Sequence, residues 1–206
     1  MSVGAAQNER LAALTAAGTS VWLDQIRRGM IEDGELSRLV EEDSLRGLTS
    51  NPAIFEKAIL GSSDYDEQIA ELAEQGMSAR EMFDEIAILD VQLACDVLRP
   101  VWDEANGADG FVSLEVSPLI AYDSDTTFSE AKRLHAKGGR RNLFIKIPGT
   151  LEGLTAIEES IFAGVPINVT LLFSPKQYLA AAEAYTRGIE RRTSSSYASE
   201  PPIALS

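Results

Sequence analysis

Two kinds of hydrophobic pattern alternate along the chain, one typical of strands and one typical of helices. In five short stretches polar residues fall between apolar ones, so that one side of the expected strand is apolar and the other carries polar groups. These stretches are residues 19–24, 47–51, 111–116, 143–147 and 166–173. Between them, apolar residues recur every three or four positions, which is the spacing of a helix with one buried face.

The predicted helices separate the strands and begin at recognisable residues. We expect helical structure over residues 8–17, 29–42, 53–106, 127–137, 151–163 and 176–191. Ser78 and Glu81 have the spacing of a capping box, and Ser174-Pro175 is a typical helix start. Strands that alternate with helices in this way predict successive βα units and a parallel sheet.

The polar residues within the strands favour a barrel over an open sheet. Each strand has one apolar face and one face with polar groups near its C-terminal end, as expected for a barrel lumen. No glycine-rich dinucleotide motif follows the first strand. A complete (β/α)₈ barrel typically needs about 250 residues, whereas this chain has 206. We therefore predict an α/β fold, a partial (β/α)₈ TIM barrel with about five of the eight βα units.

Composition and charge narrow the possible partners. The chain is 45% hydrophobic and 24% charged, with a formal net charge of −14. An acidic surface argues against nucleic acid or an anionic membrane as partner, but it permits a small phosphorylated substrate. No apolar run reaches the length of about 18 residues that spans a membrane, and the start does not resemble a secretory signal. A single cysteine favours a reducing, cytoplasmic location, and one histidine with one cysteine argues against a zinc site.

The stretch 143–147 predicts a buried strand with a lysine, Lys146, among apolar residues. Leu143, Ile145 and Ile147 share one face, and Phe144 and Lys146 share the other. Burial disfavours a charged ammonium, and the neutral amine is a nucleophile toward carbonyls. Lys146 is therefore a candidate Schiff-base lysine, although it could also extend from the strand end to water.

The inward-facing polar residues form a chemically coherent set. A lysine that forms an iminium with a ketone makes an electron sink, so that the adjacent carbon–carbon bond can break. One carboxylate must then take the proton of the hydroxyl that becomes an aldehyde, and a second can move protons through water. Amides and hydroxyls can hold the substrate. The set is Asp24, Thr49, Asn51, Glu115, Lys146, Asn168 and Thr170.

The motifs around these residues resemble those of the transaldolase family, in its longer actinobacterial or cyanobacterial type. The resemblance covers residues 8–192 and is most specific in two stretches, Thr49-Ser50-Asn51-Pro52-Ala53-Ile54-Phe55 and Asn168-Val169-Thr170-Leu171-Leu172-Phe173-Ser174. The stretches 21–24, 112–116 and 145–148 agree in order and spacing.

This resemblance implies a class I aldolase type of barrel and a role for each candidate. Lys146 would form the Schiff base, and Asp24 would deprotonate the hydroxyl at the cleaved bond. Glu115 and Thr170 would hold the catalytic water. Asn51 and Asn168 would bind the dihydroxyacetone hydroxyls, with support from Thr49. The implied reaction transfers a dihydroxyacetone unit between sugar phosphates in the non-oxidative pentose phosphate pathway, with no cofactor.

Each candidate also has a structural interpretation that leaves it without a catalytic role. Asp24 could pair with Arg27 or Arg28, and Glu115 could simply pair with Lys146. Asn51, before a proline, could shape a turn. Asn168, Thr170 and Thr49 could be hydrogen-bonded polar groups of the lumen.

The end of the chain departs from the family pattern. Residues 193–206 are rich in serine and proline and predict a disordered tail after an incomplete barrel domain at 1–192. The resemblance places the family's phosphate site on later strands. An unclosed sheet would expose its edges, so we expect aggregation or a partner that closes it. A simple sugar-phosphate aldolase and a non-catalytic truncated fragment are therefore alternatives to a transaldolase. The sequence does not indicate an oligomeric state.

Overall fold

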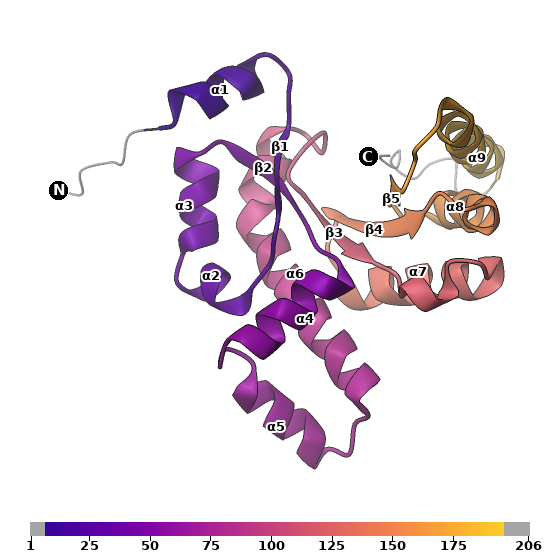
Figure 1. Cartoon of the computed structure of the whole chain (residues 1–206). Coiled ribbons are helices and arrows are strands. Elements are labelled where there is room, and N and C mark those ends of the chain that lie inside the picture. Colours follow the sequence, from indigo (N-terminus) through magenta and orange to yellow (C-terminus); the bar gives the residue numbers. More distant parts are fainter. Residues whose placement is uncertain (1–6, 196–206) are drawn as a thin grey trace. The chain divides into compact units, whose positions relative to one another are not determined.

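The structure is a computed structural model that describes residues 7–195. Its strands and helices alternate along the chain, as the sequence predicts (Figure 1). The strands are β1 (Val21–Asp24), β2 (Leu45–Thr49), β3 (Phe111–Glu115), β4 (Leu143–Pro148) and β5 (Ile167–Thr170). The helices are α1 (Glu9–Ala16), α2 (Arg28–Glu32), α3 (Glu35–Glu42), α4 (Pro52–Gly61), α5 (Asp66–Glu74), α6 (Ala79–Glu104), α7 (Ser124–Gly138), α8 (Leu151–Ala163) and α9 (Pro175–Thr193), with a short 3₁₀ turn, η1 (Pro118–Ile120).

The order of the strands identifies the fold class. The five strands form one sheet in the order β1-β2-β3-β4-β5, and the pairs β1–β2 and β4–β5 are parallel. Strands that follow one another in chain order are typical of a (β/α) barrel, whereas a doubly wound sheet reverses its order at a switch point. The fold is therefore a partial (β/α)₈ barrel of five βα units, which confirms the prediction from the sequence.

The chain divides into two compact units, and we describe each by itself. Within the described residues, the first unit comprises residues 7–112 with Arg140–Asn142, and the second comprises Ser113–Gly139 with residues 143–195. The first unit therefore holds β1, β2 and helices α1 to α6, while the second holds β4, β5 and helices α7 to α9.

Helix α6 provides much of the core of the first unit. It begins with the predicted capping box, in which the Ser78 amide donates to Glu81 Oε2 at 2.8 Å and the Glu81 amide donates to Ser78 Oγ at 3.4 Å. The Cys95 side chain on α6 is completely buried, and burial raises the pKa of its thiol. Asn142 Nδ2 donates to the carbonyl oxygens of Cys95 and Gly110, both at 2.9 Å, so the helix is tied to the residues before β3.

Strand β4 and helix α8 form the centre of the second unit. Every residue of β4 is buried, and α8 packs against both α7 and α9 (Figure 1). The backbones of α8 and α9 lie close together at Gly188. A Cβ atom there would lie 2.8 Å from the carbonyl oxygen of Glu158 and 2.8 Å from Cβ of Ile161.

Four boundaries differ from those predicted. The helix expected over 29–42 is divided into α2 and α3, because Gly34 adopts a left-handed conformation with φ of 78°. The helical region 53–106 contains the predicted helix start at Ser78, and it has a further break, between α4 and α5, that was not predicted. The second strand begins at Leu45 and ends at Thr49, so Asn51 lies outside it. The fifth strand ends at Thr170, because Leu171 has a φ of +61°, which breaks an extended strand.

The proposed domain boundary and tail fall at the edge of the described residues. Helix α9 ends at Thr193, one residue beyond the predicted boundary, and residues 196–206 lie outside the described part of the chain. Within residues 7–195, no helix combines the length and the apolar character that crossing a membrane requires.

The tight contact at Gly188 gives a test of the packing in the second unit. We expect Gly188→Ala to lower the free energy of unfolding by about 1–3 kcal/mol, because a backbone oxygen cannot make room for the added methyl group. Gly61→Ala is the matched control, because its Cβ would enter open space at the end of α4. It should leave stability unchanged or raise it by up to about 1 kcal/mol. Urea denaturation would measure both, and equal effects would contradict this account of the contact.

Candidate active site

Strand pairing in the second unit places Lys146 beside Asn168. The parallel register of β4 and β5 sets Lys146 opposite Asn168 and Pro148 opposite Thr170. Because side chains alternate along a strand, Lys146 points away from the face of Ile145 and Ile147, whose side chains are completely buried. Lys146 is 8% exposed, which confirms that this lysine is buried.

Glu115 lies next to the lysine on the neighbouring strand. The Val116 amide donates to the Lys146 carbonyl oxygen at 3.2 Å, which fixes β3 against β4 at this point. Lys146 Nζ and Glu115 Oε2 are 3.6 Å apart, and the two side chains are 11% and 19% exposed. The ion pair that the sequence suggested as an alternative role for Glu115 is therefore present. The same arrangement puts a carboxylate and an amine close enough to share one bridging water molecule, a geometry that suits proton transfer.

A serine that the sequence analysis did not select joins the same site. Asn168 Nδ2 donates to Ser113 Oγ at 3.0 Å, so side chains from β3 and β5 meet although β4 lies between these strands in the sheet order. Side chains from alternate strands meet in this way in the layered interior of a (β/α)₈ barrel. The signal in the sequence was the position of Ser113 two residues before Glu115, on the same face of the strand.

Thr170 presents a polar atom for which the described chain offers no partner. Its Oγ1 is buried and makes no hydrogen bond with residues 7–195. The backbone of Thr170 is nevertheless fixed, since the Gly149 amide donates to its carbonyl oxygen at 2.7 Å. A buried hydroxyl usually has a partner, so this one indicates a place for water or a substrate oxygen near the end of β5.

The remaining candidates lie in the first unit. Asp24 and Thr49 end β1 and β2 and are paired in the parallel register. Arg27 forms an ion pair with Asp64, and Arg28 with Asp90, so both arginines suggested as partners of Asp24 have other carboxylates.

Asn51 caps a helix, which is a structural role other than the turn suggested from the sequence. Its side-chain oxygen accepts a hydrogen bond from the Ile54 amide at 3.0 Å and caps the start of α4. A cap of this kind satisfies an amide that the helix leaves without an acceptor. The cap uses only the oxygen of the side-chain amide, so a substrate role for Asn51 remains a prediction.

The candidates thus form two groups, one in each unit. The second unit brings together Lys146, Glu115, Asn168 and Ser113 around β4, with Thr170 at the end of β5. The first unit brings Asp24 and Thr49 side by side. Within residues 7–195, no group of three or more histidine, cysteine, aspartate or glutamate residues is arranged to hold a metal ion.

The unpartnered hydroxyl of Thr170 can be tested by its effect on stability. Thr170→Val removes the hydroxyl but loses no hydrogen bond within the described chain, so we expect a change in unfolding free energy of less than about 1 kcal/mol. In the matched control, Thr127→Val, the lost hydroxyl donates to the Ile120 carbonyl oxygen at 2.8 Å and is buried. That variant should lose about 1–3 kcal/mol. A comparable loss in Thr170→Val would show that its hydroxyl has a structural partner.

Comparison with known proteins identifies the family of the chain. Residues 21–200 match the family described as Transaldolase/Fructose-6-phosphate aldolase. The chain is 47% identical to Transaldolase 2 of Nostoc punctiforme over 175 residues. This aligned region covers 85% of the chain and 46% of the relative. It is 45% identical over 186 residues to a transaldolase of Mycobacterium bovis, covering 90% of this chain and 50% of the relative. The chain spans about half the length of the curated relatives it matches. On the strength of these matches, the chain belongs to the transaldolase/fructose-6-phosphate aldolase family.

Proposed function

We propose that this chain carries the Schiff-base chemistry of a transaldolase. The donor would be sedoheptulose 7-phosphate or fructose 6-phosphate, and the acceptor glyceraldehyde 3-phosphate or erythrose 4-phosphate. The observation that carries the proposal is a buried lysine 3.6 Å from a carboxylate on the adjacent strand, in a chain of this family. The names of the relatives support the same reaction.

The first half of the reaction uses the residues of the second unit. The Lys146 amine attacks the ketone carbon of the donor, and the carbinolamine loses water to give an iminium. Glu115, through a water held with Thr170, gives the proton that the departing hydroxyl needs. Asn168 binds a hydroxyl of the three-carbon unit that stays on the enzyme, and its bond to Ser113 fixes the orientation of the amide.

Bond cleavage and transfer complete the reaction. Asp24 takes the proton from the hydroxyl next to the cleaved bond, the bond electrons move into the iminium, and an aldose phosphate leaves. The resulting enamine adds to the acceptor aldehyde, which takes the proton back from Asp24. Water then hydrolyses the new iminium and frees Lys146. Asn51 binds the second hydroxyl of the three-carbon unit, with Thr49 in support. These steps consume no redox equivalent and use side chains of the chain together with water.

The setting follows from the same chemistry. The partners would be small sugar phosphates of the non-oxidative pentose phosphate pathway, and not nucleic acid. We place the protein in the cytoplasm, where such phosphates are metabolised, and the single buried Cys95 fits a reducing compartment.

Trapping the imine tests the proposal directly. After incubation with fructose 6-phosphate and reduction by borohydride, we expect a three-carbon adduct on Lys146, detected by peptide mass. Lys146→Met should abolish it. The matched control is Lys132→Met, because Lys132 lies over the Phe128 ring on α7 and has no assigned part in the chemistry. Absence of any adduct from the folded chain would reject the proposal and favour a non-catalytic fragment.

The family description also names an aldolase, which defines the second candidate function. A transaldolase transfers the three-carbon unit to erythrose 4-phosphate and forms sedoheptulose 7-phosphate. A fructose-6-phosphate aldolase instead releases free dihydroxyacetone. Measuring both products after the trapping experiment separates the two activities.

A further inference from the structure

A network of buried polar contacts holds the segment that follows Asp24. Three residues, 25–27, connect the end of β1 to the start of α2. Strand β1 is bonded to one neighbour, β2, in the order of the described sheet. The ladder therefore fixes Asp24 from one side only, and the connecting segment needs other contacts to hold it.

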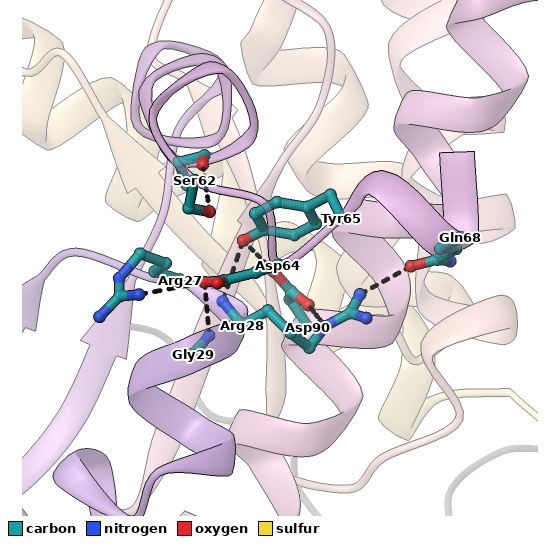
Figure 2. A network of polar contacts seen from close by, with 9 residues as sticks. Arg27, Arg28, Gly29, Ser62, Asp64, Tyr65, Gln68 and Asp90 are labelled. Atoms are coloured by element: carbon teal, nitrogen blue, oxygen red, sulfur yellow. Dashed lines mark hydrogen bonds and ion pairs between the residues drawn. The ribbon is translucent and has the colours of Figure 1, made fainter. Parts of the chain in front are cut away.

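Arg28 and two partners far along the chain form the centre of this network (Figure 2). The Arg28 guanidinium forms an ion pair with Asp90 through Nε. The Tyr65 hydroxyl accepts a hydrogen bond from the Arg28 backbone amide at 2.9 Å and donates one to Asp90 Oδ2 at 2.9 Å. Arg28 Nη2 also donates to Gln68 Oε1 at 2.8 Å. Tyr65 and Asp90 are completely buried.

The pKa shifts of Tyr65 and Asp90 are consistent with the hydrogen bond from the Tyr65 hydroxyl to the Asp90 carboxylate. Burial and the charge of Asp90 raise the pKa of Tyr65 well above its usual range, so its hydroxyl keeps the proton that it donates. Burial also raises the pKa of Asp90, against the opposing effect of the bonds from Arg28 and Tyr65. The hydrogen bonds from Arg28 and Tyr65 therefore favour the charged form of the Asp90 carboxylate, which burial disfavours.

Asp64 holds the next residue of the segment. Its Oδ2 accepts from the Gly29 amide at 3.0 Å and from Arg27 Nη1 at 3.0 Å. Although partial burial acts in the other direction, the Gly29 amide and the Arg27 guanidinium lower the pKa of Asp64. Side chains at positions 64 and 65 thus bind the backbone amides of two successive residues, 28 and 29, as Figure 2 shows.

The chemistry of the network indicates that it fixes the position of the backbone at the start of α2. Well-packed apolar side chains often stabilise a core as well as a buried ion pair does, so a buried ion pair is weak evidence for stability. What apolar side chains cannot do is accept hydrogen bonds from backbone amides. The network uses that ability at the two residues where α2 begins, four and five positions after Asp24.

We propose that Tyr65, Asp90 and Asp64 are positioning residues that hold Asp24 through the segment between β1 and α2. This inference rests on the proposed function, in which Asp24 takes the proton during bond cleavage. Proton transfer needs the base within hydrogen-bond reach of the hydroxyl, and a displacement of about 1 Å can cost about 100-fold in rate. Imine formation depends on Lys146, which belongs to the other unit. Loss of the network should therefore slow cleavage and leave imine formation intact.

Tyr65→Phe tests this inference in the full chain, because it removes one oxygen atom and keeps the ring. With fructose 6-phosphate and borohydride, we expect the trapped adduct on Lys146 to change from mainly three carbons to mainly six. The ratio of three-carbon to six-carbon adduct should fall by about tenfold or more. Hydrogen exchange at the Arg28 amide should become faster, which is a readout independent of catalysis. Asp96→Asn is the matched control, because Asp96 lies on α6 as Asp90 does. The substitution disrupts only an exposed ion pair, between Asp96 and Arg140, and should change neither readout.

The outcomes separate this inference from the proposed function. A wild-type chain that gives no adduct overturns both. If the wild type gives a three-carbon adduct and Tyr65→Phe gives the same ratio, the positioning role is wrong and the proposed function stands. If Tyr65→Phe does not fold, Asp64→Ala decides, because Asp64 is partly exposed. Its removal frees the Gly29 amide, Arg27 and the Ser62 side chain, and leaves the contacts of Tyr65 and Asp90 in place. A ratio unchanged from the wild type in that variant overturns the inference.

Discussion

Parallel strand pairing is the constraint on which the candidate chemistry depends. The register of β4 against β5 puts Lys146 beside Asn168, and the bond from Val116 to the Lys146 carbonyl oxygen brings β3 alongside. Because side chains alternate, a shift of one residue would turn Lys146 to the opposite face of the sheet. The completely buried side chains of Ile145 and Ile147 prevent such a shift, since it would exchange apolar for charged groups in the core. The apolar half of β4 thus determines where its lysine lies.

Much of this could be predicted from the sequence, because strand periodicity is a local property. The alternation in 111–116 and 143–147 correctly placed Glu115 and Lys146 on neighbouring strands, and the strand order confirmed a barrel type of fold. The ends of elements were harder to predict. Leu171 terminates β5 through a positive φ that leucine rarely adopts. Ser113 was not selected because its place on the same strand face as Glu115 does not reveal that its hydroxyl meets Asn168.

The polar network around Arg28 could not be predicted from the sequence at all. The residues that its hydrogen bonds join lie 25 to 62 positions apart in the sequence. Nothing in the sequence around Arg28 indicates Tyr65 or Asp90 as its partners. Helix capping behaves differently, because Ser78 with Glu81 and Ser174 with Gln177 act within one turn. The predictable parts of the chain are thus those in which cause and effect lie within a few residues. The contacts that connect α2 to α5 and α6 arise only from the tertiary fold.

The single thiol also decides how the molecule can be observed in solution. Cys95 is buried in the first unit, and both tryptophans of the chain, Trp22 and Trp102, lie in that unit as well. Thiol labelling and tryptophan fluorescence would therefore both report on the opening of the first unit. Lys146 and its neighbours lie in the second unit, which has no cysteine and no tryptophan. An unfolding curve followed by either probe would report directly on the half of the chain that contains Asp24, because neither probe lies beside the lysine.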